Sequence, residues 1–305
     1  MVFPGQGSQS VGMQSDLAQA CGEVLVTYDQ ASERLGYDLW DLVQNGSPDK
    51  LNETIVTQPA MLAAGIAAWR CWSKAGGANP EIMAGHSLGE YTALVAAGAL
   101  NFSDAISLVR KRAELMQQAV PAGIGAMAAI LGLDDEEILD VCDDSSSIGI
   151  AEAVNFNSPG QVVVAGHRAA LERVIVLANE RGARRAIMLH VSVPSHSSLM
   201  HPAGDLLAEA LANTEFHSPA IPVVNSVNAA FYGDPDDIRE RLKAQVFSPV
   251  RWVKTVRFML ENGATSFIEC GPGRVLSGLH KRIDRTIPVG RIETRESLTE
   301  ALEQQ

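Results

Sequence analysis

Short apolar runs alternate with longer segments of helical periodicity along most of the chain. Runs at residues 1–3, 80–84, 221–227 and 265–269 are typical of short buried strands. Helices are predicted at residues 24–35, 38–43, 58–76, 88–100, 103–121, 199–211, 234–245 and 249–262. We place the start of the third helix at Gln58-Pro59, since proline suits a first helical turn. Strands that alternate with helices predict a mainly parallel sheet covered on both faces.

Residues 125–191 follow a different order of elements. Strands are predicted at 127–133, 148–154, 161–165 and 185–191, and helices at 135–142 and 169–181. The turn-rich segment 155–160, Asn-Phe-Asn-Ser-Pro-Gly, is expected to join the two middle strands. The resulting order β-α-β-β-α-β is that of a ferredoxin-like unit. We therefore expect residues 125–191 to form a small inserted subdomain.

The most distinctive stretch is Gly85-His86-Ser87-Leu88-Gly89-Glu90-Tyr91, which contains the pattern G-x-S-x-G. At a sharp turn from strand to helix this pattern exposes a serine hydroxyl, and its glycines permit close backbone approach. An ordinary turn that happens to hold a serine fits the same five residues. With the flanking strand and helix, the pattern predicts an α/β fold in which residues 1–124 and 192–305 form an α/β-hydrolase-like core.

A serine nucleophile needs a base, and His196 is the best candidate among the seven histidines. It lies in the loop Pro194-Ser195-His196, after an expected strand at 186–193. Gln6, Ser87 and His196 each follow a predicted strand, so we expect them at one edge of the sheet. No acidic residue between the serine and the histidine stands out, and a backbone or amide carbonyl could orient the imidazole.

Two further features near the serine suggest binding roles. The amide N–H of Leu88 is positioned by the elbow to stabilise an oxyanion, and the glycine-rich turn around Gln6 could supply a second donor. His86 adjoins the serine but points elsewhere, because successive residues at a turn diverge. We therefore give His86 a substrate-binding role at most.

Arg112 is the one basic residue of its helix expected to point inward. At about 100° per residue, Arg110 and Lys111 lie about 100° and 200° from Val109, whereas Arg112 lies about 60° away at the edge of the apolar stripe. A buried arginine needs an anionic partner. An internal carboxylate and the carboxylate of a substrate both remain open at this point.

Composition excludes several classes of function. The net charge of −12 argues against a nucleic acid partner. No apolar run has the length of a membrane span, and the first residues do not have the pattern of a signal peptide, so we expect a cytoplasmic protein without a membrane partner. The four cysteines lack the spacing of a disulfide framework or a zinc site, and we expect neither a metal nor another cofactor.

Six segments together resemble the malonyl-CoA:acyl carrier protein transacylases of bacterial fatty acid synthesis. They are Phe3 to Gln9, the heptad at 85–91, Arg112, residues 154–166, Pro194-Ser195-His196 and the turn Gly271 to Gly273. The resemblance covers essentially the whole chain. It implies that malonyl-CoA acylates Ser87, that His196 is the general base and acid, and that the malonyl group passes to the phosphopantetheine thiol of acyl carrier protein.

The same resemblance implies roles for further residues. Arg112 would bind the malonyl carboxylate, which favours the substrate over an internal ion pair. Gln6 and the Leu88 amide would form the oxyanion hole, and the main-chain carbonyl of Gln245 would orient His196. Three more polar side chains would lie near the substrate: Gln58, Asn155 and Asn157.

Two other classes of function compete with this interpretation. A serine esterase or lipase of the α/β-hydrolase type shares the elbow, but it requires an acid between the serine and a late histidine and releases acyl groups to water. A carrier-protein-binding module without catalysis would leave Ser87 inert to a malonyl thioester.

Overall fold

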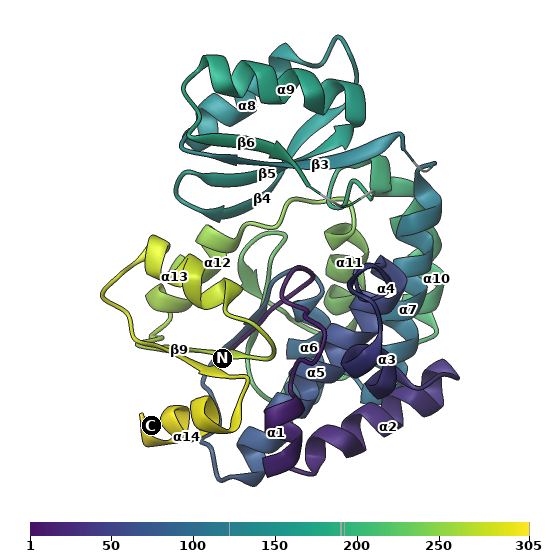
Figure 1. Cartoon of the computed structure of the whole chain (residues 1–305), viewed down its shortest axis with the longest axis vertical. Helices are drawn as coiled ribbons and strands as arrows, with labels where there is room; N and C mark the ends of the chain where they lie inside the picture. The colour runs from purple at the N-terminus through teal and green to yellow at the C-terminus, as the bar shows by residue number, and fades with distance from the viewer. Residues whose placement is uncertain (122, 190, 192, 305) are drawn as a thin grey trace.

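Two sheets organise the computed structural model, which describes residues 1–121, 123–189, 191 and 193–304 (Figure 1). The larger sheet has the order β10-β9-β1-β2-β7-β8. Its strands are β1 (Val2–Phe3), β2 (Met83–Gly85), β7 (Val223–Asn225), β8 (Ala230–Phe231), β9 (Phe267–Cys270) and β10 (Val289–Ile292). Neighbouring strands pair in parallel except at β7 and β8, which are antiparallel. The fold is therefore a mixed α/β fold with a mainly parallel sheet.

Helices cover both faces of the larger sheet, because alternate strand residues point to opposite sides. Phe3 and Met83 belong to the core cluster shared with α5 (Thr54–Lys74) and α6 (Gly89–Ala96), whereas Val2 and Ala84 belong to the cluster shared with α12 (Trp252–Glu261) and α13 (Val275–Ile283). The helices of this part are α1 (Ser15–Ala20), α2 (Glu23–Leu35), α3 (Leu39–Asn45), α4 (Pro48–Leu51), α5 (Thr54–Lys74), α6 (Gly89–Ala96), α7 (Phe102–Ala119), α10 (His201–Ala212), α11 (Pro235–Gln245), α12 (Trp252–Glu261), α13 (Val275–Ile283) and α14 (Arg295–Glu303).

Several elements differ from the sequence-based expectations, among them the starts of α5 and α7 and the two edge strands of the larger sheet. Helix α5 begins at Thr54 and includes Pro59, since a proline in the second turn removes only one backbone hydrogen bond. The cap of α7 is Asn101, whose side chain accepts from the N–H of Ser103, so Ser103 is already helical. The edge strands β8 and β10 were not predicted, because β8 has only two residues and the apolar run of β10 is interrupted by Gly290 and Arg291.

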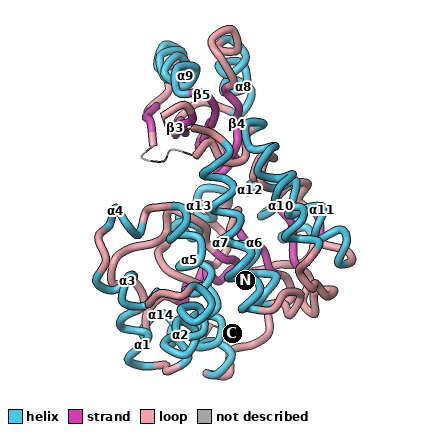
Figure 2. The backbone as a smooth tube through the Cα atoms, turned by 90° about the vertical axis from the view of Figure 1, so that its right-hand side faces the viewer, coloured by secondary structure: helices cyan, strands magenta, loops and turns pink. Residues whose placement is uncertain are grey.

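The smaller sheet is antiparallel and has the order β4-β5-β3-β6. It contains β3 (Gly125–Leu131), β4 (Ala151–Ser158), β5 (Gln161–His167) and β6 (Arg185–Met188), with α8 (Asp135–Asp144) and α9 (Arg168–Glu180). The two helices lie together on the outer side of this sheet, above the rest of the molecule (Figures 1 and 2). Residues 190 and 192, within the strands expected at 185–191 and 186–193, lie outside the described residues.

Strand β4 begins three residues later than the strand expected at 148–154 and continues to Ser158, and it pairs with the segment that precedes α12. Residues 155–158 continue the strand rather than forming a turn, because their main chain pairs with β5 on one side and with Val250 on the other. Phe156 donates its N–H to the Val250 carbonyl at 2.9 Å, and Val250 donates to the Val154 carbonyl at 2.8 Å. This connection places Asn155 and Asn157 beside the end of the larger sheet.

The glycines around Ser87 permit backbone contacts that no other residue allows. A Cβ on Gly85 would lie 1.8 Å from the carbonyl carbon of Gly89. A Cβ on Gly89 would lie 2.1 Å from the carbonyl oxygen of Phe3. The G-x-S-x-G pattern is thus required by the close packing of β1, β2 and α6.

We expect G89A to lower the free energy of unfolding by about 3 kcal/mol, because the backbone at Phe3 and Pro4 must shift to admit the methyl group. The matched control is G278A in α13, where a Cβ meets no atom within 4 Å. That change should raise the free energy by up to about 1 kcal/mol through helix propensity. Urea denaturation measures both, and equal stability of the two variants would contradict the packing argument.

Candidate active site

The turn that carries Ser87 is backbone-strained. Ser87 has a φ of 52°, in the left-handed region that side chains other than glycine rarely adopt. Strand β2 ends at Gly85 and α6 begins at Gly89, so the serine occupies the tight turn between them. Strain of this kind persists where the surrounding structure enforces it, often at functional sites.

Ser87 and His196 form a hydrogen-bonded pair. The Ser87 Oγ lies 2.7 Å from His196 Nε2, and His196 Nδ1 lies 2.7 Å from the main-chain carbonyl oxygen of Gln245. Because that carbonyl can only accept, Nδ1 carries the proton and Nε2 presents its lone pair to the serine hydroxyl. The contact that sequence comparison implied for the Gln245 carbonyl is therefore present.

The loop that holds His196 differs from the prediction. The preceding strand, β6, ends at Met188 and belongs to the smaller sheet, so His196 does not follow a strand of the larger sheet. His196 has a φ of 68°, and its N–H donates to the Val246 carbonyl at 3.0 Å. This hydrogen bond holds the loop in place. Ser87 lies at the edge of the larger sheet because it follows β2, as predicted. His196 reaches Ser87 from a loop that does not follow a strand of that sheet.

Burial keeps the imidazole neutral. His196 is 3% exposed, and burial lowers its pKa to about 3, with the positive charge of Arg112 acting in the same direction. A neutral imidazole can accept the proton of Ser87 at physiological pH.

Arg112 lies inside the protein beside the serine, as helical periodicity predicts. It is 2% exposed. Its Nη1 donates to Gln58 Oε1 at 2.8 Å, and its Nη2 donates to Gln245 Oε1 at 3.0 Å and to Ser87 Oγ at 3.4 Å. Within the described ranges no carboxylate forms an ion pair with it. The structure thus lacks the internal ion pair, and an anion brought to the serine could bind this guanidinium.

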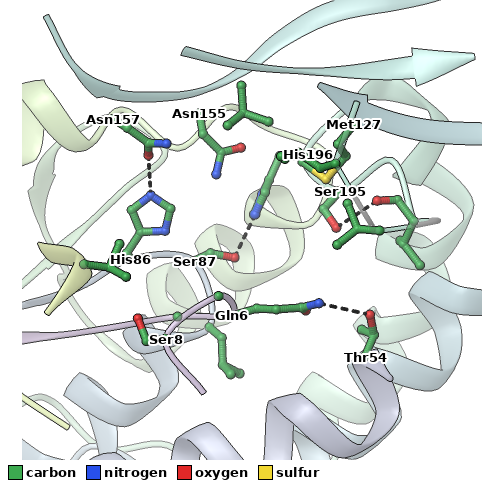
Figure 3. Close-up of a pocket in the computed structure, with 18 of the residues that line it drawn as sticks. Gln6, Ser8, Thr54, His86, Ser87, Met127, Asn155, Asn157, Ser195 and His196 are labelled. Atoms are coloured by element: carbon green, nitrogen blue, oxygen red, sulfur yellow. Dashed lines mark hydrogen bonds between the residues drawn. The ribbon is translucent and has the colours of Figure 1, made fainter. Parts of the chain in front are cut away.

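A pocket of about 490 Å³ opens above Ser87, between the two sheets (Figure 3). The candidate residues that line it are Gln6, Gln58, His86, Ser87, Leu88, Arg112, Asn155, Asn157 and His196. Gln245 lies behind this lining and is fully buried. The pocket also has an apolar side, formed by residues such as Met127 and Val163 of the smaller sheet, which the sequence analysis did not identify.

Two amides at the pocket floor are free to bind an oxyanion. Neither the Gln6 nor the Leu88 N–H donates to another of the described residues. The Gln6 side chain turns away from Ser87 and donates to Thr54 Oγ1 at 3.4 Å (Figure 3). The main chain of Gln6, rather than its side chain, is therefore the donor available near the serine.

The remaining polar candidates are His86, Asn155 and Asn157, which line the side of the pocket next to β4. His86 Nε2 donates to Asn157 Oδ1 at 2.8 Å, and this contact joins the elbow to β4 (Figure 3). The imidazole of His86 thus points away from Ser87, as expected. The side chain of Asn155 lies between the two histidines, and its buried Oδ1 has no hydrogen-bond partner in the described structure.

Sequence reasoning missed Glu90, which is completely buried behind the site. Its carboxylate accepts hydrogen bonds from Ser226 Oγ, from Tyr232 OH at 2.5 Å and from Gln245 Nε2 at 2.7 Å. Its position three residues after Ser87 was the available signal, since a charged residue within an apolar helix segment requires partners.

Among the described residues, no group of three or more His, Cys, Asp or Glu side chains could hold a metal ion. No helix in the described part of the chain is long and apolar enough to cross a membrane.

Comparison with known proteins gives consistent matches over the whole chain. A family model described as the acyl transferase domain matches residues 1–291. The chain is 50% identical over 303 residues to the malonyl CoA-acyl carrier protein transacylase of Salmonella typhimurium, covering 99% of this chain and 98% of that protein. It is 44% identical over 308 residues to the Bacillus subtilis protein of the same name, covering 100% and 97%.

Solved structures that resemble this chain have names of the same kind. A crystal structure of an acyl carrier protein S-malonyltransferase from Vibrio cholerae is 53% identical, with a TM-score of 0.95 and 98% of each chain covered. A malonyl-transacylase in complex with a type II PKS acyl-carrier protein is 51% identical, with a TM-score of 0.99, covering 100% of this chain and 99% of that one.

The low pKa of His196 predicts the pH dependence of serine acylation. A base whose pKa is lowered to about 3 stays unprotonated at all higher pH values, so the acylation rate should be flat from about pH 8 to about pH 5. Single-turnover acylation by p-nitrophenyl acetate measures this, with circular dichroism to verify folding at each pH. An acid limb centred near pH 6.5, the ordinary value for histidine, would contradict the assignment.

Proposed function

The chain belongs to the acyl transferase family and, within it, to the malonyl CoA-acyl carrier protein transacylases, and we propose that Ser87 and His196 carry out its reaction. The protein transfers the malonyl group of malonyl-CoA to acyl carrier protein. The observation that carries the assignment of residues is the Ser87–His196 hydrogen bond, with a buried guanidinium 3.4 Å from the same hydroxyl.

The first half-reaction acylates the serine. His196 Nε2 takes the proton of Ser87 as Oγ attacks the thioester carbonyl of malonyl-CoA. Negative charge develops on the carbonyl oxygen, and the N–H groups of Gln6 and Leu88 stabilise it. The intermediate then collapses, and the imidazolium of His196 returns its proton to the departing CoA sulfur. The product is a malonyl ester of Ser87.

The second half-reaction reverses these roles. The phosphopantetheine thiol of acyl carrier protein gives its proton to His196 and attacks the serine ester. Collapse of the second intermediate returns the proton to Ser87 Oγ and releases malonyl carrier protein. The Gln245 carbonyl orients the imidazole throughout, so no carboxylate is needed in contact with the histidine. The transfer involves no redox change, and we propose that it requires no metal or other cofactor.

Arg112 determines which acyl group is accepted. Its guanidinium is held by two glutamine side chains and carries no protein carboxylate, so the carboxylate of a malonyl group can bind it. An acetyl group would leave the buried charge unpaired. Gln58 orients Arg112. Asn155 and the His86–Asn157 pair line the other side of the pocket and limit the space for the substrate there.

The esterase alternative is not favoured. A hydrolase of that type places an acid against its histidine, whereas the group at His196 Nδ1 is a main-chain carbonyl.

We assign the finer architecture as an α/β-hydrolase-like core of residues 1–124 and 192–305 with a ferredoxin-like subdomain at 125–191. The order β3-α8-β4-β5-α9-β6 and the antiparallel pairing of the smaller sheet support the second part of this assignment. A cytoplasmic location is the compartment expected for an enzyme of bacterial fatty acid synthesis, and we propose it for this chain.

The arginine assignment predicts a change of acyl preference. R112A should lower kcat/KM for malonyl transfer by about 100-fold, because a charge-assisted, bidentate contact is lost, while acetyl transfer from acetyl-CoA is retained or increased. R112K should also be impaired, since lysine lacks the planar fork. Both acyl transfers are measured with the carrier protein as acceptor, alongside free acid released to water.

The matched control is K111A, which removes an exposed charge from the neighbouring position of α7. It should leave both transfers unchanged. Unaltered malonyl kinetics in R112A would disprove the clamp, and release to water that rivals thiol transfer in the unmodified protein would favour the esterase.

A further inference from the structure

The buried carboxylate of Glu90 lies behind the guanidinium of Arg112, and the side chain of Gln245 separates the two groups. Glu90 is in the first turn of α6 and has no exposed surface. Three donors converge on it: Ser226 Oγ, Tyr232 OH and Gln245 Nε2. An ionised carboxylate accepts only, so this surrounding of donors fits the charged form. Burial raises its pKa, and the three hydrogen bonds oppose that effect.

Gln245 connects this carboxylate to both functional side chains. Its Nε2 donates to Glu90 Oε1 at 2.7 Å and to the Ser87 carbonyl oxygen at 2.9 Å. Its Oε1 accepts from Arg112 Nη2 at 3.0 Å, and its main-chain oxygen accepts from His196 Nδ1 at 2.7 Å. Every polar atom of the Gln245 side chain is therefore used, and each points to a different part of the site.

The partners of the Gln245 amide permit only one orientation. If the amide were turned over, its oxygen would face the carboxylate of Glu90 and the carbonyl of Ser87, which are both acceptors. Its nitrogen would at the same time face Arg112, which is a donor. All three contacts would be lost in a buried site, where unpaired polar groups are costly. The carboxylate of Glu90 and the carbonyl of Ser87 thus together determine that Arg112 meets the oxygen of this amide.

We propose that Glu90 is a positioning residue for malonyl transfer, which holds Arg112 in place through Gln245 without occupying its carboxylate-binding face. This inference rests on the proposed function, and it names the group that prepares the malonyl site. A carboxylate in direct contact with Arg112 would compete with the substrate. A carboxylate separated from it by one neutral amide balances part of the buried charge and leaves the guanidinium open.

The electrostatics of Arg112 agree with this arrangement. Burial lowers its pKa, and the nearby Tyr91 and Glu90 act in the opposite direction. Glu90 is the nearby group that carries a full negative charge when ionised. The guanidinium remains protonated with its Nη atoms held by Gln58 and Gln245, and its Nε has no partner in the described structure.

The test is the ratio of kcat/KM for malonyl transfer to kcat/KM for acetyl transfer. E90Q keeps the shape of the side chain but removes the negative charge, and it replaces one of the two acceptors of Gln245 Nε2 with a neutral amide. Its ratio should fall by about tenfold, the scale of one charge-assisted hydrogen bond, because only the malonyl group uses Arg112. Acetyl transfer depends on His196 and should change little.

The matched control is E269Q at the end of β9. Glu269 is equally buried, and its carboxylate accepts from the N–H groups of Leu276 and Ser277 and from Ser277 Oγ. None of these hydrogen bonds involves Gln245 or Arg112. E269Q should lose thermal stability and keep the malonyl-to-acetyl ratio of the unmodified protein. An E90Q variant that lowers both transfers in equal proportion has only a structural defect, and that result would overturn the proposal.

A second variant covers the case in which E90Q does not fold. Q245M removes the amide at nearly constant side-chain length, so Arg112 loses the same acceptor and the ratio should fall as in E90Q. In the double variant the two losses should not add, because both act through one contact. An unchanged ratio in Q245M overturns the proposal, whereas failure of the unmodified protein to transfer malonyl overturns the proposed function itself.

Discussion

The hydrogen bonds of Gln245 fix the positions of His196, Arg112 and Glu90 relative to one another. The end of α11 brings its main-chain carbonyl to His196 and its side chain to Arg112 and Glu90. These contacts determine the tautomer of the base and the orientation of the guanidinium together. Catalysis by a serine depends on such fixed geometry, since a misplaced base or oxyanion donor loses most of its effect.

The surrounding fold supplies the strain that this geometry requires. Ser87 and His196 both have a positive φ, and close backbone packing at Gly85 and Gly89 holds the serine turn. Strand β4 of the smaller sheet pairs with Val250 in the segment before α12, so backbone hydrogen bonds hold this wall of the pocket against the larger part of the molecule. The smaller sheet forms one wall of the pocket, and the loops after β1 and β2, with residues of α5, α7 and α13, form the other.

Local sequence patterns predicted the parts of the structure that depend on neighbours in the chain. The elbow, the inward face of Arg112 and the element order of residues 125–191 all follow from short-range periodicity and steric rules. The prediction of a strand before His196 was wrong about the sheet, because the apolar run that precedes the loop belongs to the smaller sheet. The role of β4 was missed for a similar reason, since its pairing with Val250 joins residues almost 100 positions apart. Glu90 could not be assigned, because its partners Ser226, Tyr232 and Gln245 are brought to it only by the tertiary fold.

The most direct test of Ser87 as the nucleophile is the intact mass of the protein after brief exposure to malonyl-CoA, with S87A treated in parallel. We expect one malonyl group on the unmodified protein, none on S87A, and loss of the adduct when carrier protein with a free phosphopantetheine thiol is added. Free CoA without any adduct would indicate rapid hydrolysis and contradict transfer. An adduct of equal amount on S87A would contradict Ser87 as the nucleophile.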